Sequence, residues 1–159
     1  MRILGIDPGT SRIGYGFIEI VGPSLKLLRH GVIEAKEKTL QGKLVNLISQ
    51  LRNLLEEMAP DAAAIEKIFF AKNQKTAIDV AQARGAILSL LLQRNIPTAE
   101  FSPNEVKSQV TGYGLADKKG VAKMVKAILR VGELPGYDDA SDALAIAITA
   151  ANHKRLGIG

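Results

Sequence analysis

The chain opens on Met1-Arg2-Ile3-Leu4-Gly5-Ile6-Asp7, an apolar run that closes on an acid and is followed by Pro8-Gly9. Large apolar residues before an Asp-Pro-Gly breaker predict a buried strand over residues 2–7. A second apolar run, Ala62-Ala63-Ala64-Ile65, predicts a short buried strand over residues 61–66 that closes on Glu66. Both strands therefore end on a carboxylate, and α/β sheets bind ligands at the carboxyl ends of their strands.

The rest of the pattern surrounds these two strands with helices and further strands. Residues 12–20 and 25–35 predict strands joined by a short turn, which favours an antiparallel meander with the first strand. Residues 97–101 predict a fifth strand. Apolar periodicity and breakers predict helices over residues 39–58, 76–94, 103–111, 118–131 and 139–154. This order predicts an α/β fold, with a mixed sheet flanked by helices.

Length and composition limit the classes of protein that the chain could be. Its 159 residues fit one domain over 1–159, and 47% of them are apolar. The absence of cysteine excludes disulfides and thiolate zinc sites. We expect a cytoplasmic protein without a membrane partner, because no apolar run reaches the length of a membrane span and no signal-type segment opens the chain. The net charge of +5 favours a polyanionic partner.

Two further acids, Asp139 and Asp142, open the last predicted helix and lie on one side of it. Taken singly, each acid has a simpler interpretation: Asp7 as a turn former, Glu66 as a solvated loop residue, Asp142 as a complement to the helix dipole. Two carboxylates ~4 Å apart repel by about 4 kcal/mol at an effective dielectric of 20. Four that converge are tolerable mainly around a hard cation, so the sequence predicts a metal-dependent enzyme acting on phosphodiesters.

Three later segments join the first one in a pattern of high specificity. They are Ile65-Glu66-Lys67-Ile68-Phe69-Phe70-Ala71-Lys72-Asn73, Ala81-Gln82-Ala83-Arg84-Gly85 and Asp139-Ala140-Ser141-Asp142-Ala143-Leu144-Ala145. Together with Gly5-Ile6-Asp7-Pro8-Gly9-Thr10-Ser11, they closely resemble the RuvC family of bacterial Holliday-junction resolvases. The resemblance runs from the first residue to about Ala150.

The resemblance implies a ribonuclease-H-like fold, with a five-stranded mixed sheet of three antiparallel and two parallel strands. It implies a magnesium-dependent endonuclease that nicks two opposed strands of four-way junction DNA in recombination and repair. Two Mg²⁺ ions per site are expected, with Mn²⁺ as an alternative. The expected partners are a second copy of the chain, forming a homodimer, and the branch-migration motor of RuvA and RuvB.

By the same resemblance, the catalytic and metal-binding residues are Asp7, Glu66, Asp139 and Asp142. We expect Asp7 to bridge the two ions, Glu66 and Asp142 to hold one each, and Asp139 to ligate directly or through water. The adjacent Asp138 leaves the third acid open, although the family pattern fits Asp139 and leaves Asp138 as a helix cap. Lys118 matches a basic residue that acts near the scissile phosphate and is counted as catalytic.

A basic stripe of Lys119, Lys123, Lys126 and Arg130 at helical spacing could bind phosphate, or it could be a solvated helix face. Arg84 could clamp a phosphate, or its stem could pack against its own helix. By resemblance, Phe69 stacks on an unpaired base at the junction centre. The residues expected to contact DNA are Phe69, Lys72, Arg84, Lys107, Lys118, Lys119 and Lys123.

Three other functions compete with this interpretation. The Asp-x-Gly-Thr segment at Asp7 also occurs in actin-like and sugar-kinase ATPases, but those need a second domain that 159 residues do not provide. The other two are a junction-binding relative without catalysis and a ribonuclease-H-like nuclease acting on RNA–DNA hybrids. The apolar later half of helix 76–94 could form a dimer seam or could pack under the sheet.

Overall fold

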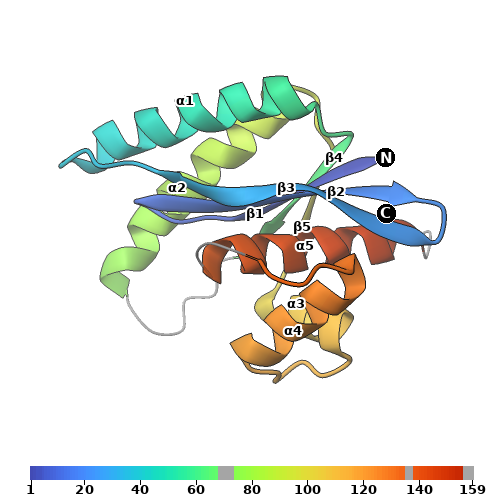
Figure 1. Ribbon diagram of the computed structural model, residues 1–159. Helices are drawn as coiled ribbons and strands as arrows, with labels where there is room; N and C mark the ends of the chain where they lie inside the picture. The colour runs from blue at the N-terminus through green and yellow to red at the C-terminus, as the bar shows by residue number, and fades with distance from the viewer. Residues whose placement is uncertain (68–73, 135–137, 156–159) are drawn as a thin grey trace.

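The computed structural model describes residues 1–67, 74–134 and 138–155, without the side chains of residues 74–76 and 155. These ranges contain all the predicted elements, with ends that shift by a residue or two (Figure 1). The strands are β1 (Arg2–Asp7), β2 (Arg12–Val21), β3 (Ser24–Glu34), β4 (Ala62–Glu66) and β5 (Thr98–Phe101). The helices are α1 (Leu40–Met58), α2 (Gln74–Gln93), α3 (Pro103–Thr111), α4 (Lys118–Leu129) and α5 (Asp138–Arg155).

The five strands form one mixed sheet in the order β3-β2-β1-β4-β5. β1, β2 and β3 are antiparallel neighbours, whereas β4 pairs in parallel with β1 and with β5. The predicted meander and the mixed sheet are therefore confirmed. Since β1 and β4 run side by side in the same direction, Asp7 and Glu66 lie at the same end of the sheet, where the carboxyl ends of these two strands meet; we call this end the edge that carries the acids.

Helices cover both faces of this sheet, α1 and α2 on one side and α3, α4 and α5 on the other (Figure 1). The strand residues alternate between two hydrophobic cores, as a side-chain period of two requires. Leu4, Ile6 and Ile65 belong to the core under α1 and α2. Ile3 and Ala64 belong to the core that contains α5. The described helices include none long and apolar enough to cross a membrane.

Helix α5 lies unusually close to the middle of the sheet, because glycines line the strand surface beneath it. A Cβ atom at Gly5 would lie 1.9 Å from the carbonyl oxygen of Ala143, and one at Gly14 would lie 2.1 Å from that of Asp139. A Cβ at Gly16 would meet the side chain of Leu144 at 2.6 Å. Only residues without a side chain allow the α5 backbone this approach, which fixes where its first turns lie.

Three details of the helices differ from the prediction or decide between alternatives. Asp138 is the first residue of α5, and therefore lies inside the helix rather than capping it. Arg130 is the left-handed C-cap of α4 (φ 56°), so it ends the basic stripe instead of continuing it along the helix. In α2, Ile87, Leu90 and Leu91 are buried in the core, so the later half of this helix packs under the sheet.

We predict that Gly14→Ala destabilises the protein by about 1–3 kcal/mol, the usual cost of forcing extra volume into a packed site. The added methyl group would overlap the carbonyl oxygen of Asp139 and push the first turn of α5 outward. Urea unfolding followed by circular dichroism measures the loss. Gly132→Ala is the control, because a Cβ at Gly132 meets nothing within 4 Å. Equal stability of the two variants would contradict the close approach of α5.

Candidate metal and DNA site

The alternation of the strands decides which face of the sheet receives the two strand-end carboxylates. Ile6 and Ile65 point into the core under α1 and α2, so the next residue of each strand points to the other face. Asp7 and Glu66 are those residues, and each is the last one of its strand. Both half-buried carboxylates therefore face the side of the sheet that α5 covers.

Helix α5 brings Asp139 and Asp142 to the same edge, because it begins there and rests on the glycines of β1 and β2. Each of these two acids forms an ion pair with a cation of the protein itself. Arg12 Nε lies 3.4 Å from Asp139 Oδ2, and Lys118 Nζ lies 3.3 Å from Asp142 Oδ2. This end of the sheet thus holds acids from β1, β4 and α5, together with one cation from β2 and one from α4.

The acids act on one another electrostatically. Burial raises the pKa of Asp7 to about 8, and the charges of Glu66, Asp142 and Asp139 add to this rise. Burial also raises the pKa of Glu66, with a further contribution from Asp142. The pKa of Asp142 is raised by burial even though Lys118 acts in the opposite direction. The ionised form of this group of acids is costly, so the site favours any bound positive charge.

The donor set has the chemistry of a divalent cation site, although its side chains do not converge on a single point. Within the described ranges, no three acidic or histidine side chains stand in an arrangement that would hold an ion. Asp139 and Asp142 would have to turn from Arg12 and Lys118 to do so. Four carboxylates, partly buried and mutually repelling, nevertheless match the all-oxygen ligands that hard cations such as Mg²⁺ prefer.

Two lysines predicted to contact DNA lie beside the acids. Lys118 is the first residue of α4, where the Asp117 side chain caps the helix by accepting from Gly120 N at 2.8 Å. The charge of Asp142 raises the pKa of Lys118. Lys107 lies on α3, and its charge offsets part of the rise in the pKa of Glu66 that burial causes. A phosphate group that approaches the acids would therefore meet both ammonium groups.

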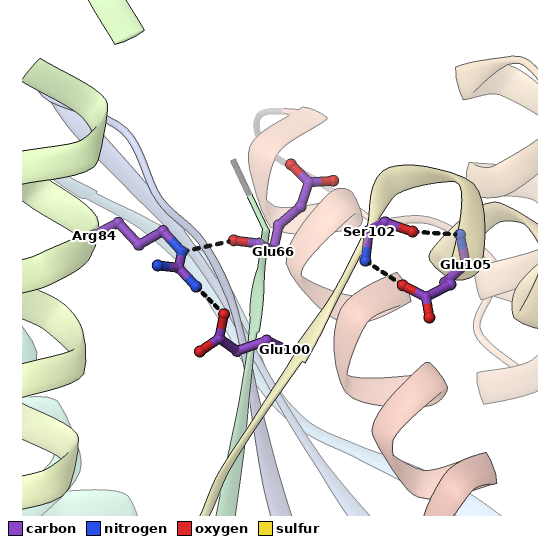
Figure 2. A network of polar contacts seen from close by, with 5 residues as sticks. All are labelled: Glu66, Arg84, Glu100, Ser102 and Glu105. Atoms are coloured by element: carbon purple, nitrogen blue, oxygen red, sulfur yellow. Dashed lines mark hydrogen bonds and ion pairs between the residues drawn. The ribbon is translucent and has the colours of Figure 1, made fainter. Parts of the chain in front are cut away.

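The capping of α3 fixes the start of the helix that carries Lys107. Ser102 Oγ accepts from Glu105 N at 3.2 Å, and Glu105 Oε2 accepts from Ser102 N at 2.7 Å (Figure 2). This capping box, with Pro103 in the first turn, starts the helix directly after β5. Because β5 pairs with β4 next to Glu66, the start of α3 is fixed relative to the acids.

The other predicted DNA contacts fall into three groups. Lys119 and Lys123 are exposed on α4 beside Lys118. Arg84 lies on α2, on the other face of the sheet, where it contacts Glu66 through the main chain (Figure 2). Phe69 and Lys72 lie outside the described residues, so their assignment stays a prediction.

Arg12 was not expected at the site. It begins β2, and its proximity to Asp139 depends on the register that sets Asp7 opposite Gly14. A clue was present in Gly14-Tyr15-Gly16, since small residues at every second position of a strand signal a close approach by another backbone.

Known proteins resemble this chain along nearly its whole length. The family model described as crossover junction endodeoxyribonuclease RuvC matches residues 3–150. The crossover junction endodeoxyribonuclease RuvC of Petrotoga mobilis is 47% identical over 156 residues, covering 98% of this chain and 96% of the relative. That of Thermosipho melanesiensis is 48% identical over 157 residues, covering 98% of this chain and 100% of the relative.

Solved structures agree with the sequence comparison. Thermus thermophilus RuvC in complex with Holliday junction substrate superposes with a TM-score of 0.91 at 32% identity, covering 99% of this chain and 97% of that one. Another structure of T. thermophilus RuvC gives a TM-score of 0.90 at 31% identity, covering 99% and 98%. These likenesses confirm the ribonuclease-H-like mixed sheet, and with the family match they show that the chain belongs to the crossover junction endodeoxyribonuclease RuvC family.

Proposed function

We propose that the chain is a structure-specific endonuclease that resolves four-way DNA junctions by metal-dependent hydrolysis of phosphodiester bonds, in recombination and repair. The observation that carries this proposal is that Glu66, Asp139 and Asp142 lie close enough to Asp7 for their charges to add to the rise of its pKa to about 8. Membership of the family supports it, as does the solved T. thermophilus relative with its Holliday junction substrate.

The four carboxylates are the proposed ligands of two Mg²⁺ ions, with Mn²⁺ as a substitute. Asp7 is the proposed shared ligand, because the other three acids all contribute to its raised pKa. Bound divalent cations supply an activated water and neutralise charge on the reacting phosphate. The protein itself contributes the rigid strand ends that hold Asp7 and Glu66, and the helix turn that holds Asp139 and Asp142.

Lys118 and Lys107 are the proposed contacts to the phosphate that is cut. Lys118 is 70% exposed, so its ammonium group can turn from Asp142 to a phosphate oxygen. There it would stabilise the negative charge that develops as the bond breaks. Lys119 and Lys123, one and five residues further along the chain, are proposed to hold the DNA backbone and set its position. Phe69 and Lys72 complete the proposed DNA contacts.

A homodimer is proposed because paired cuts in a junction with two-fold symmetry require two sites. A groove between α1 and α2 is a suitable seam, since it lies on the face of the sheet away from the acids. Its lining includes Leu44, Val45, Ile48 and Ala86, and Val45 is 73% exposed. Cooperation with the RuvA–RuvB branch-migration motor, and action in the bacterial cytoplasm, are proposed from the family.

We predict that the purified protein cuts a mobile four-way junction in Mg²⁺ and not in chelator, and leaves plain duplex and RNA–DNA hybrid intact. Asp7→Asn should reduce cleavage by at least ~10³-fold, because it removes the shared ligand, while junction affinity in chelator changes less than threefold. Gel assays of cleavage and fluorescence anisotropy of binding measure the two effects. Cleavage of the hybrid alone would favour a different ribonuclease-H-like activity, and binding without any cleavage would favour a non-catalytic relative.

We predict that Lys118→Gln and Lys123→Gln affect different quantities. Lys123→Gln should weaken binding of junctions of any sequence and lower the slope of log affinity against log salt by about one, since one phosphate contact is lost. Lys118→Gln should lower the single-turnover cleavage rate by about 10²-fold, the scale for losing one donor to developing charge. Anisotropy across 50–200 mM salt and single-turnover kinetics separate the two. Equal effects of both substitutions on rate and on affinity would contradict these roles.

We predict that the stability of the protein in chelator depends on pH through Asp7, and Asp7→Asn tests this. Because the pKa of Asp7 rises from 3.8 to about 8 on folding, the folded protein retains a proton that the unfolded chain loses. The free energy of unfolding should therefore fall as pH rises from about 4 to about 8 in chelator. At pH 8.5, Asp7→Asn should be more stable than the wild type by about 1–2 kcal/mol, the usual gain from relieving one unfavourable feature.

Thermal unfolding in chelator from pH 4 to 8.5 measures this difference, which should vanish near pH 4. Added Mg²⁺ should stabilise the wild type most at high pH and should stabilise Asp7→Asn much less. A wild type whose stability in chelator does not fall across this range would contradict the raised pKa of Asp7.

A further inference from the structure

Arg84 joins three elements at the edge of the sheet where Glu66 lies. Its Nε donates to the main-chain carbonyl oxygen of Glu66 at 3.1 Å, and its terminal nitrogen pairs with the carboxylate of Glu100 (Figure 2). Arg84 belongs to α2, Glu66 is the last residue of β4, and Glu100 lies on β5. The Arg84 side chain is only 18% exposed and that of Glu100 is 41% exposed, so the contact with the Glu66 carbonyl is shielded from solvent more than the ion pair with Glu100.

The alternation of side chains separates Arg84 from the acids themselves. Ile65 and Glu100 are direct neighbours in the parallel ladder, and Ile65 points to the face that α2 covers. Arg84 reaches Glu100 and the Glu66 carbonyl from that face. The Glu66 carboxylate points away from Arg84 toward α5, as Figure 2 shows. Arg84 therefore does not share the space where the acids, a metal ion and a phosphate would meet.

The contact falls at the carboxyl end of β4, at the residue that carries the Glu66 carboxylate. Glu66 ends β4, and Lys67 N, one residue further along, donates to Phe101 O of β5 at 2.8 Å. A hydrogen bond from a charged donor is about twice as strong as a neutral one. Because Arg84 holds the carbonyl of Glu66, it limits rotation of the peptide group between Glu66 and Lys67.

We propose that Arg84 is a positioning residue, which holds the strand end so that the Glu66 carboxylate is presented to the metal ions, and is not a phosphate clamp. Residues that orient metal ligands typically change metal affinity or activity by 10–100-fold when they are replaced. Glu100 completes the arrangement by holding the guanidinium against β5. The inference rests on the proposed role of Glu66 as a metal ligand.

The test compares Arg84→Gln and Arg84→Lys with Arg94→Gln. Arg94 follows directly after α2 and pairs with Glu56 of α1, so its replacement also removes an arginine–glutamate ion pair, but one without a contact to Glu66 among those of the described residues. Three quantities are measured for each protein: the Mg²⁺ concentration for half-maximal junction cleavage, the shift in melting temperature caused by Mg²⁺ without DNA, and junction affinity in chelator.

For Arg84→Gln we expect the half-maximal Mg²⁺ concentration to rise 10–100-fold and the Mg²⁺-induced melting shift to shrink, with junction affinity changed less than twofold. Arg84→Lys should fall between Arg84→Gln and the wild type, because an ammonium group cannot make both contacts in the same geometry. Arg94→Gln should match the wild type in its metal dependence.

Two results would overturn the inference while leaving the proposed function intact. Loss of junction affinity in Arg84→Gln with unchanged metal dependence would make Arg84 a phosphate clamp. Equal metal dependence of Arg84→Gln and Arg94→Gln would make Arg84 a general structural residue. A wild type that neither cuts junctions nor gains stability from Mg²⁺ would instead overturn the proposed function, and this inference with it.

Discussion

The contact between the α5 backbone and the glycines of β1 and β2 is the constraint on which the site depends. A helix normally packs on a sheet through side chains from both partners, which keep the two backbones apart. Here Gly5 and Gly14 supply no side chain, and the carbonyls of Ala143 and Asp139 occupy the space that a Cβ atom would need. The start of α5 is thereby placed against the ends of the strands, which brings Asp139 and Asp142 close to Asp7.

This placement works against the stability of the metal-free protein. Burial of Asp7 at this place raises its pKa, and the charges of Glu66, Asp142 and Asp139 add to the rise. Arg12 and Lys118 offset part of this cost through their ion pairs, although both are exposed enough for solvent to weaken the attraction. Apolar packing of α5 must supply the remainder, and residues Ala143–Ile148 are buried throughout.

The parts of this arrangement that local pattern encodes could be predicted, and those that depend on register could not. Asp7 and Glu66 each follow an apolar run, so their place at strand ends was visible in the sequence. The pairing of Arg12 with Asp139 was not, because it requires the alignment of β2 with β1 and the path of α5. The later half of α2 is apolar on several faces, and only the structure shows that Ile87, Leu90 and Leu91 pack in the core while Leu92 stays exposed.

Arg84 shows most clearly why contacts that depend on strand register and packing cannot be predicted from the sequence. Its role depends on the main-chain carbonyl of Glu66, and a carbonyl is present at every residue, so no pattern of side chains marks it as an acceptor. Once the sheet is formed, the period of two puts the Glu66 carboxylate on one face, while Glu100 pairs with Arg84 from α2 on the other. In the proposed site, the metal ligands would therefore lie on one face and the residue that positions Glu66 on the opposite face. If Arg84 acts as proposed, its replacement would change the chemistry through the single peptide group that it contacts.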